Sequence, residues 1–300
     1  MNLQFKKIEI SDKPFFDACL AGRKHENIFF NFTSLYIWQD WDPFVWTEID
    51  GAACVRGTYE HRDAAPPPLA ATDQAILNAT ERMIQHYRAR GIPFLMTEVT
   101  DSYVQLYQAA WPDRFRVHEY RAGANYIYRV EDLALLRGRR YSGKRNHIHQ
   151  FKRANPETVL LPLTEREIPL CLGLFDEWAR HKENQLDSKL ERKGLVRAFD
   201  HLAELDYQGA CLYSSGRMIG FTLGEPLDAE TVGIHIEKAD YSYHGAFTVL
   251  NQLFLQNYWM NYTYVNRAED MGEEGMRIAK LSYHPCGLNM KYNLTLQEEE

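Results

Sequence analysis

The chain has 300 residues, of which 45% are hydrophobic and 25% charged, and its formal net charge is −7 at pH 7. This is the composition of a soluble globular protein, with one large domain or two of ordinary size and a core that needs no covalent staple. The acidic balance argues against a protein that binds polyanions generally.

The five cysteines are scattered and none forms a Cys-x-x-Cys pair. This distribution argues against a disulfide framework and a structural zinc site, and we identify no metal site. The N-terminal residues lack the apolar core of a signal peptide, and no run approaches the ~18 apolar residues of a membrane span. We therefore expect a cytoplasmic protein with no stable membrane insertion. The sequence leaves the oligomeric state open.

The first half alternates strand and helix patterns. A strand-like stretch at the N-terminus precedes a short helix, and Asp50-Gly51 marks the turn of a hairpin. The expected elements are a strand over 3–10, a helix over 11–20, hairpin strands over 44–49 and 52–57, a helix over 72–90, a strand over 94–99, a helix over 102–110, and strands over 115–118 and 125–129. An aromatic-rich stretch over 27–46 indicates core packing or the wall of a ligand cleft.

A basic segment, Leu136–Arg153 (LRGRRYSGKRNHIHQFKR), follows these strands and contains no acidic residue. Arg145, His149 and Lys152 are spaced four and three apart, so they share one face of a helix. A cluster of positive charge in an otherwise acidic chain predicts a specific anionic partner. The alternative is a solvated helix that links two domains and pairs with acids nearby. The segment holds seven cationic residues, namely Arg137, Arg139, Arg140, Lys144, Arg145, Lys152 and Arg153.

In the second half, Thr164 and Glu167 form a capping box at the start of a helix, and Ser215-Gly216 marks a hairpin. The expected elements are a strand over 159–163, helices over 164–182 and 194–204, hairpin strands over 211–213 and 218–223, a strand over 231–237, a helix over 245–258, a strand over 262–266, a helix over 275–284 and a strand over 292–296. Residues 75–110 and 245–284 repeat the order helix, strand, helix after a hairpin. This repeat predicts two domains, 1–154 and 155–300.

The element order of the second half resembles the GNAT acyltransferase fold. Three stretches, YIYRVEDLALLRGRRYSGKRNHIHQFKR, IHIEKAD…HGAF and YVNRAEDMGEEGMRIAKLSYHP, resemble the C-terminal domain family of phosphatidylglycerol lysyltransferase, most strongly over 126–285. The resemblance implies an α/β (α+β) fold of two tandem GNAT-like domains, each a mixed twisted sheet flanked by helices. It also implies transfer of an aminoacyl group from aminoacyl-tRNA to an amine or hydroxyl of a lipid, peptide or small molecule.

Under this resemblance, the basic segment holds the phosphates of the tRNA acceptor end, as a cluster of cations does for any nucleic acid backbone. Aromatic side chains stack its terminal bases. The residues expected to bind the donor are Arg139, Arg140, Lys144, Arg145, His149 and Lys152.

The catalytic candidates lie at the ends of second-half elements. The resemblance implies Glu237, at the end of TVGIHIE, as general base and Tyr283 as acid for the leaving group. Ligands of α/β sheets collect at carboxyl ends of strands, which suggests Asn266 for orienting a carbonyl. Ordinary ion pairing, helix capping and packing remain the alternatives. Three further binding candidates are Lys238 for an anion, Asp270 for the α-ammonium of the aminoacyl group and Lys280 for the ribose hydroxyl.

The loop Ser242-Tyr-His-Gly-Ala-Phe247 departs from a GNAT pyrophosphate loop, which carries more small residues before its helix. Gly245 is the one cofactor-binding candidate there, and Phe247 obstructs close approach of a backbone to phosphates. The loop counts against acetyl-CoA, so no cofactor is assigned and aminoacyl-tRNA is the expected co-substrate. An acetyl-CoA-dependent N-acetyltransferase and a non-catalytic binding module are the alternatives.

Overall fold

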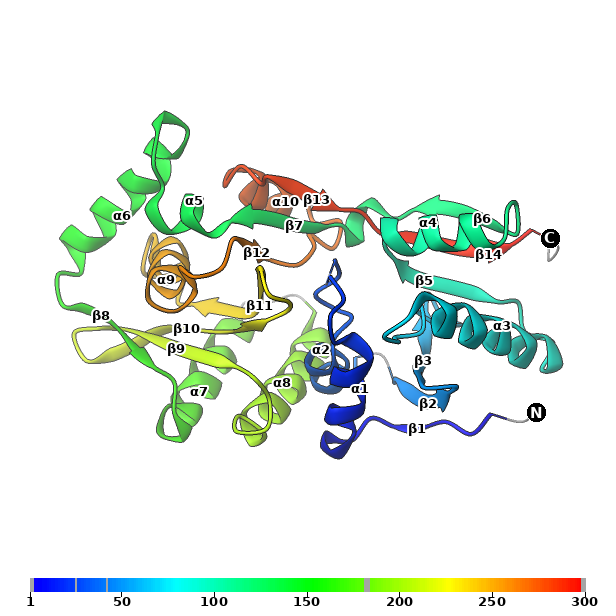
Figure 1. Ribbon diagram of the computed structural model, residues 1–300. Helices are drawn as coiled ribbons and strands as arrows, with labels where there is room; N and C mark the ends of the chain where they lie inside the picture. Colours follow the sequence, from blue (N-terminus) through cyan, green and yellow to red (C-terminus); the bar gives the residue numbers. More distant parts are fainter. Residues whose placement is uncertain (1–2, 25, 42, 181–183, 298–300) are drawn as a thin grey trace. The chain divides into compact units, whose positions relative to one another are not determined.

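Figure 1 shows the computed structural model, which describes residues 3–24, 26–41, 43–180 and 184–297. The chain divides into two compact units. Unit 1 contains Met1–Asn125, Glu269–Arg277 and Leu288–Glu300, and unit 2 contains Tyr126–Ala268 and Ile278–Gly287. This division differs from the predicted boundary after residue 154, because the basic helix packs into the core of unit 2.

Unit 1 holds two antiparallel sheets, β1-β2-β3-β4 and β5-β14-β6. Their core contains Ile76, Ile84 and Tyr87 from one face of the long helix α3, whose N-cap Thr72 accepts a hydrogen bond from the Ala75 N–H. The predicted first strand is only two residues long. The elements are β1 (Lys6–Lys7), α1 (Lys13–Leu20), α2 (Phe32–Ile37), β2 (Val45–Ile49), β3 (Ala52–Tyr59), β4 (Arg62–Ala64), α3 (Asp73–Ala89), β5 (Leu95–Val99), α4 (Asp101–Ala110), β6 (Phe115–Glu119) and β14 (Tyr292–Leu296).

Unit 2 is built on a mixed sheet in the order β7-β12-β11-β10-β9-β8. Strands β8 to β11 form an antiparallel run, β11 and β12 are parallel, and β7 returns antiparallel to β12. The strands are β7 (Asn125–Arg129), β8 (Thr158–Pro162), β9 (Gln208–Ser214), β10 (Arg217–Pro226), β11 (Thr231–Ala239) and β12 (Tyr264–Asn266). The helices are α5 (Val130–Leu135), α6 (Ser142–Ala154), α7 (Ile168–Ala179), α8 (Gln185–Asp200) and α9 (Ala246–Phe254).

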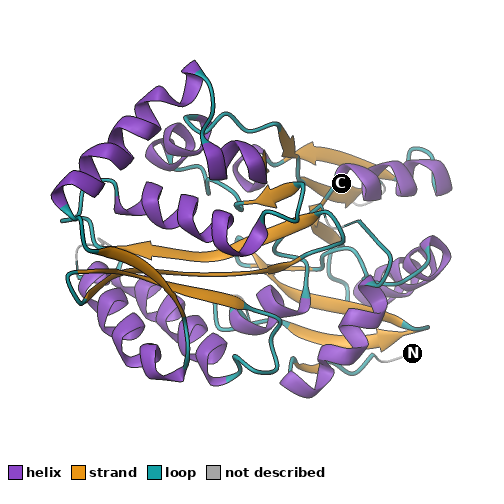
Figure 2. Ribbon diagram, turned by 60° about the vertical axis from the view of Figure 1, so that its left-hand side comes forward, coloured by secondary structure: helices purple, strands orange, loops and turns teal. Residues whose placement is uncertain are grey.

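Helices cover both faces of this sheet (Figures 1 and 2). On one face, Ile148 and Phe151 of α6 pack with Val249 and Leu250 of α9 over buried strand residues. Removing such side chains from water contributes roughly 1.5–3 kcal/mol each. On the other face lie α7 and α8, and the predicted capping box of Thr164 and Glu167 forms just before α7. The basic segment is thus an amphipathic helix with its apolar side in a core.

The parallel strand β12 runs beside only the first part of β11. All three residues of β12 pair with Thr231, Val232 and Gly233, whereas β11 continues to Ala239. Helix α10 (Glu274–Leu281) and strand β13 (Gly287–Asn289) each contain residues of both units. Beyond Gly233, side chains from other elements of unit 2 contact β11.

Candidate active site in unit 2

Beyond the end of β12, Glu237 of β11 forms an ion pair with Arg267. A carboxylate oxygen of Glu237 lies 2.9 Å from the Arg267 guanidinium, and the other oxygen accepts a hydrogen bond of 3.0 Å from the amide of Asn251 on α9. Both oxygens of Glu237 are therefore committed to donors. Its predicted role as general base remains a prediction, and this geometry favours a role in holding Arg267 in place.

Tyr283 lies just beyond α10, which ends at Leu281, whereas the sequence predicted a helix over 275–284 that would have included it. Its side chain is buried, and its hydroxyl donates a 3.1 Å hydrogen bond to the Thr248 hydroxyl of α9. The Tyr141 hydroxyl donates to the Tyr283 carbonyl at 3.2 Å. Burial raises the pKa of the Tyr283 hydroxyl, and nearby Arg267 opposes that rise. The residue is thus held at its hydroxyl and at its backbone carbonyl.

Lys144, in the first turn of α6, lies against the Tyr283 ring. Its amine is 3.6 Å from the ring centroid, and the Arg267 guanidinium carbon is 5.2 Å from the same centroid. Burial, together with the positive charge of Arg267, lowers the pKa of the Lys144 amine to about 8. Within the described ranges, no carboxylate forms an ion pair with Lys144. We call Lys144, Glu237, Thr248, Arg267 and Tyr283 the Tyr283 cluster, in which the one carboxylate pairs with Arg267 and not with Lys144.

The other cations of the basic segment divide into two groups. Arg137 and Arg140 pair with Glu131 and Asp132 at 3.0 and 2.8 Å, so acids just before the segment neutralise part of it. Arg145 donates to the carbonyls of Leu136 and Gly138 and fixes the turn that leads into α6.

The second group is exposed to solvent and includes the predicted phosphate ligands Arg139, His149 and Lys152, with Arg153 beside them. Among residues 3–24, 26–41, 43–180 and 184–297, no acid pairs with these three predicted ligands. Their role in binding phosphate stays a prediction.

Three of the predicted site residues in unit 2 bind other groups of the protein. Lys238 points to the face opposite Glu237, as alternation along a strand requires, and pairs with Glu191 at 2.6 Å over the Trp178 ring. The Lys280 amine donates to the Arg267 carbonyl. Asn266 is fully buried, and its side-chain carbonyl accepts from the Ala268 N–H at 2.9 Å. Lys280 and Asn266 therefore shape the turn that presents Arg267.

Asp270 lies in unit 1 and is wholly buried. Its carboxylate is bound by Arg277 at 2.8 and 3.1 Å and by Arg121 at 3.3 Å, and it accepts the Gly272 N–H at 2.9 Å. A carboxylate between two arginines has the partners of a structural ion-pair network. Its predicted contact with an α-ammonium stays a prediction.

Gly245 begins α9 with a φ of +91°, a conformation that favours glycine. A Cβ here would lie 3.1 Å from the His147 carbonyl of α6 and 3.4 Å from the Phe151 Cβ. The glycine therefore lets α6 cross close to the start of α9, where the imidazoles of His147 and His244 meet with centroids 5.3 Å apart. The packing of α6 accounts for this glycine without a bound phosphate.

Sequence reasoning missed Arg267, Thr248 and Asn251, which complete the site. Arg267 directly follows a short buried strand, at the kind of position that led to Asn266. Thr248 and Asn251 are three apart on one face of α9, from which Thr248 contacts Tyr283 and Asn251 contacts Glu237. Their polar side chains on an otherwise apolar helix are the sequence feature that could have indicated a site there.

Residues 3–24, 26–41, 43–180 and 184–297 contain neither a candidate metal site nor a candidate membrane span. No group of three or more His, Cys, Asp or Glu side chains in them is arranged to hold a metal ion. No helix in the same ranges combines the length and apolar character needed to cross a bilayer.

The strand order and helices of unit 2 are those of a GNAT-like acyltransferase fold, and known proteins agree. The structure of L-PGS from Bacillus licheniformis superposes with a TM-score of 0.70 at 13% identity, covering 98% of this chain and 94% of that one. A conserved protein of unknown function from Bacteroides thetaiotaomicron superposes with a TM-score of 0.90 at 31% identity, covering 98% and 100%. The predicted mixed α/β, GNAT-like fold class is confirmed.

The family model "Phosphatidylglycerol lysyltransferase, C-terminal" matches residues 23–295, and the chain belongs to this family. An uncharacterized protein of Mycoplasmoides gallisepticum is 24% identical over 180 residues, which are 59% of this chain and 56% of that protein. The match thus spans little more than half of that relative. The predicted family is confirmed, and the protein has the fold and family of an acyltransferase.

Proposed function

We propose that the protein transfers an aminoacyl group from aminoacyl-tRNA to an amine or hydroxyl acceptor at the Tyr283 cluster. The observation that carries the proposal is the close crossing of α6 over Gly245. In a CoA-dependent GNAT enzyme the backbone at this helix start receives the pyrophosphate. In this protein α6 covers the backbone at the start of α9. The same helix carries Lys144 and several exposed cations.

The chemistry needs a proton acceptor and a stabiliser of the tetrahedral oxyanion, because the donor ester is already activated. We assign proton transfer to Lys144, whose pKa of about 8 leaves a useful fraction of free amine near neutral pH. The acceptor N–H or O–H gives its proton to this amine as its heteroatom attacks the ester carbonyl. The resulting ammonium returns the proton to the ribose oxygen as the ester C–O bond breaks.

Arg267 supplies positive charge for the oxyanion, and Glu237 with Asn251 holds it in place. Tyr283 positions the Lys144 amine over its ring, since its own hydroxyl is engaged by Thr248. The family name points to phosphatidylglycerol as an acceptor to test, beside small amines.

Transfer is tested with lysyl-tRNA and alanyl-tRNA that are radiolabelled in the amino acid, mixed with vesicles containing phosphatidylglycerol or with soluble amines. We expect label in an acceptor and ester consumption faster than spontaneous hydrolysis. Lys144→Met should lower the rate about 100-fold or more, the scale of a lost general base. Lys193→Met, an exposed lysine on α8 across the sheet, should retain it. Absence of both tRNA binding and ester consumption at low and moderate salt would overturn the proposal.

A further inference from the structure

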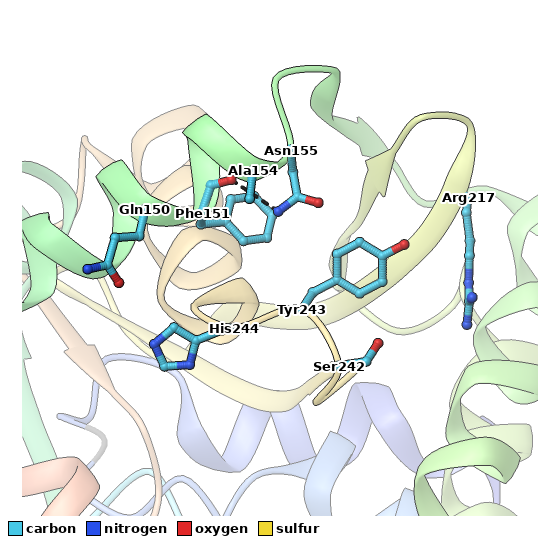
Figure 3. A pocket seen from close by; sticks show the side chains of 8 residues that line it. All are labelled: Gln150, Phe151, Ala154, Asn155, Arg217, Ser242, Tyr243 and His244. Carbon is cyan, nitrogen blue, oxygen red and sulfur yellow. Dashed lines mark hydrogen bonds between the residues drawn. The ribbon is translucent and has the colours of Figure 1, made fainter.

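An open pocket of about 470 Å³ lies between the second half of α6 and the loop before α9. Its lining combines the Tyr243 ring and the His244 imidazole with the side-chain amides of Gln150 and Asn155. Figure 3 shows the Tyr243 ring standing between Asn155 and Arg217, with His244 on the side of Gln150. None of the residues lining the pocket belongs to the Tyr283 cluster.

The lining supplies what a nucleobase requires. Tyr243 offers an aromatic face, and stacking of a base on such a ring is tolerant of its identity. The Gln150 amide has donors and an acceptor for a base edge and forms no hydrogen bond with any other described residue. The Asn155 amide, by contrast, is held by its bond to the Phe151 carbonyl at 3.0 Å, drawn in Figure 3.

Arg217 is the charged residue in the lining of the pocket, and Lys152 and Arg153 are further cations on α6. Arg217 is paired with Asp240 at 3.1 Å and with Glu177 at 3.4 Å, so its charge is already compensated. Lys152 and Arg153 are exposed on α6 next to the lining residues Phe151 and Ala154. By the helix period both project away from the face of α6 that lines the pocket, so they raise the positive charge of the helix without lining the pocket.

One face of α6 joins the pocket to the Tyr283 cluster. Lys144, His147, Phe151 and Ala154 follow one another at spacings of three, four and three. At 1.5 Å per residue the pocket lies about 10 to 15 Å along the helix axis from Lys144. That span is comparable to the length of a few linked nucleotides, with the His147–His244 contact in between.

We propose that this pocket binds a nucleobase, stacked on Tyr243 and read at its edge by Gln150. The inference deepens the proposed function and rests on it for the source of the base, the single-stranded 3′ end of tRNA. The adenosine 3′-phosphate of coenzyme A has the same chemistry and is the other source to be distinguished.

Binding is measured by anisotropy with a 5′-fluorescein CCA trinucleotide, and by competition with coenzyme A and with adenosine 3′,5′-bisphosphate. Tyr243→Ala should weaken binding about tenfold or more, whereas Tyr243→Phe, which keeps the ring, should bind as the wild type does. The matched control is Tyr241→Ala on the same loop. Tyr241 is 61% exposed, packs on Phe247 and does not line the pocket, so its loss should leave the Kd unchanged.

The outcomes separate the two proposals. Binding of CCA that depends on Tyr243 supports the pocket and its RNA source. Binding of coenzyme A that depends on Tyr243, without binding of CCA, supports the nucleobase pocket and counts against aminoacyl-tRNA as donor. If no probe binds, or if Tyr243→Ala leaves every Kd unchanged, the pocket inference is overturned, while ester transfer remains a separate test of the function.

A measurement on the unaltered protein guards against a variant that fails to fold. A CCA trinucleotide with 8-azidoadenosine at its 3′ end is bound and irradiated, and the cross-linked peptide is mapped. We expect attachment within residues 150–155 or 242–244. Attachment elsewhere, with none in these two segments, contradicts the pocket.

Discussion

At the scale of single residues, Lys144 gives the sharpest prediction because its site disfavours its charge. Its pKa is lowered from 10.5 to about 8, so between these values the unfolded chain binds a proton that the native protein does not. The free energy of unfolding therefore falls as the pH drops from about 10.5 to about 8. Below about pH 8 it stays at this lower level, because Lys144 is then charged in both states. Lys144→Met should raise the free energy of unfolding by about 1 to 2 kcal/mol at pH 7, after allowance for solvent screening.

The check is urea unfolding of both proteins at pH 7 and at pH 10, where the advantage of the variant should shrink. Lys152→Met, an exposed lysine of the same helix, serves as the comparison and should alter stability little at either pH. A Lys144→Met protein less stable than the wild type at pH 7 would show that contact with Tyr283 outweighs the cost of burial.

At the scale of elements, the crossing of α6 over the start of α9 depends on a residue without a side chain. Gly245→Ala would place a Cβ 3.1 Å from the His147 carbonyl at a φ of +91°, so we expect a loss of about 1 to 3 kcal/mol in unfolding free energy. Gly143→Ala, within α6 and with open space around it, should be neutral or stabilising by up to about 1 kcal/mol. Equal midpoints in urea for the two variants would contradict this account of the crossing.

At the scale of the whole molecule, the fragment 155–300 should not fold alone, although the sequence suggested a domain there. It lacks β7, the antiparallel neighbour of β12, and it lacks α6, whose Ile148 and Phe151 cover α9. Its exposed apolar surface should bind a hydrophobic dye, and its thermal transition should be broad or absent. A dispersed amide spectrum with cooperative unfolding of this fragment would refute the expectation.

What the sequence predicted well was local in the chain. The turns at Asp50-Gly51 and Ser215-Gly216 and the Thr164–Glu167 capping box depend on neighbouring residues, and each appears in the structure. What it missed depends on contacts between distant segments. Asp270, which was expected to bind an α-ammonium, pairs instead with Arg121, 149 residues earlier in the chain.

The same reason limits prediction of the site. Strand-end reasoning reached Glu237 and Asn266, but the partners of Glu237 come from 14 and 30 residues further along the chain. The burial that lowers the pKa of Lys144 exists only when α6 lies over Tyr283, and no local pattern reports it.

The middle strand of the β5-β14-β6 sheet has a consequence for synthesis on the ribosome. Strand β14 pairs with Leu95–Val99 on one side and Phe115–Glu119 on the other, although it spans residues 292–296. Those two earlier strands leave the exit tunnel before β14, and the edges that pair with β14 stay unpaired while residues 120–291 are translated. Nascent chains stalled before residue 292 should therefore be the ones that recruit chaperones and are cut by proteases in the segment 95–119.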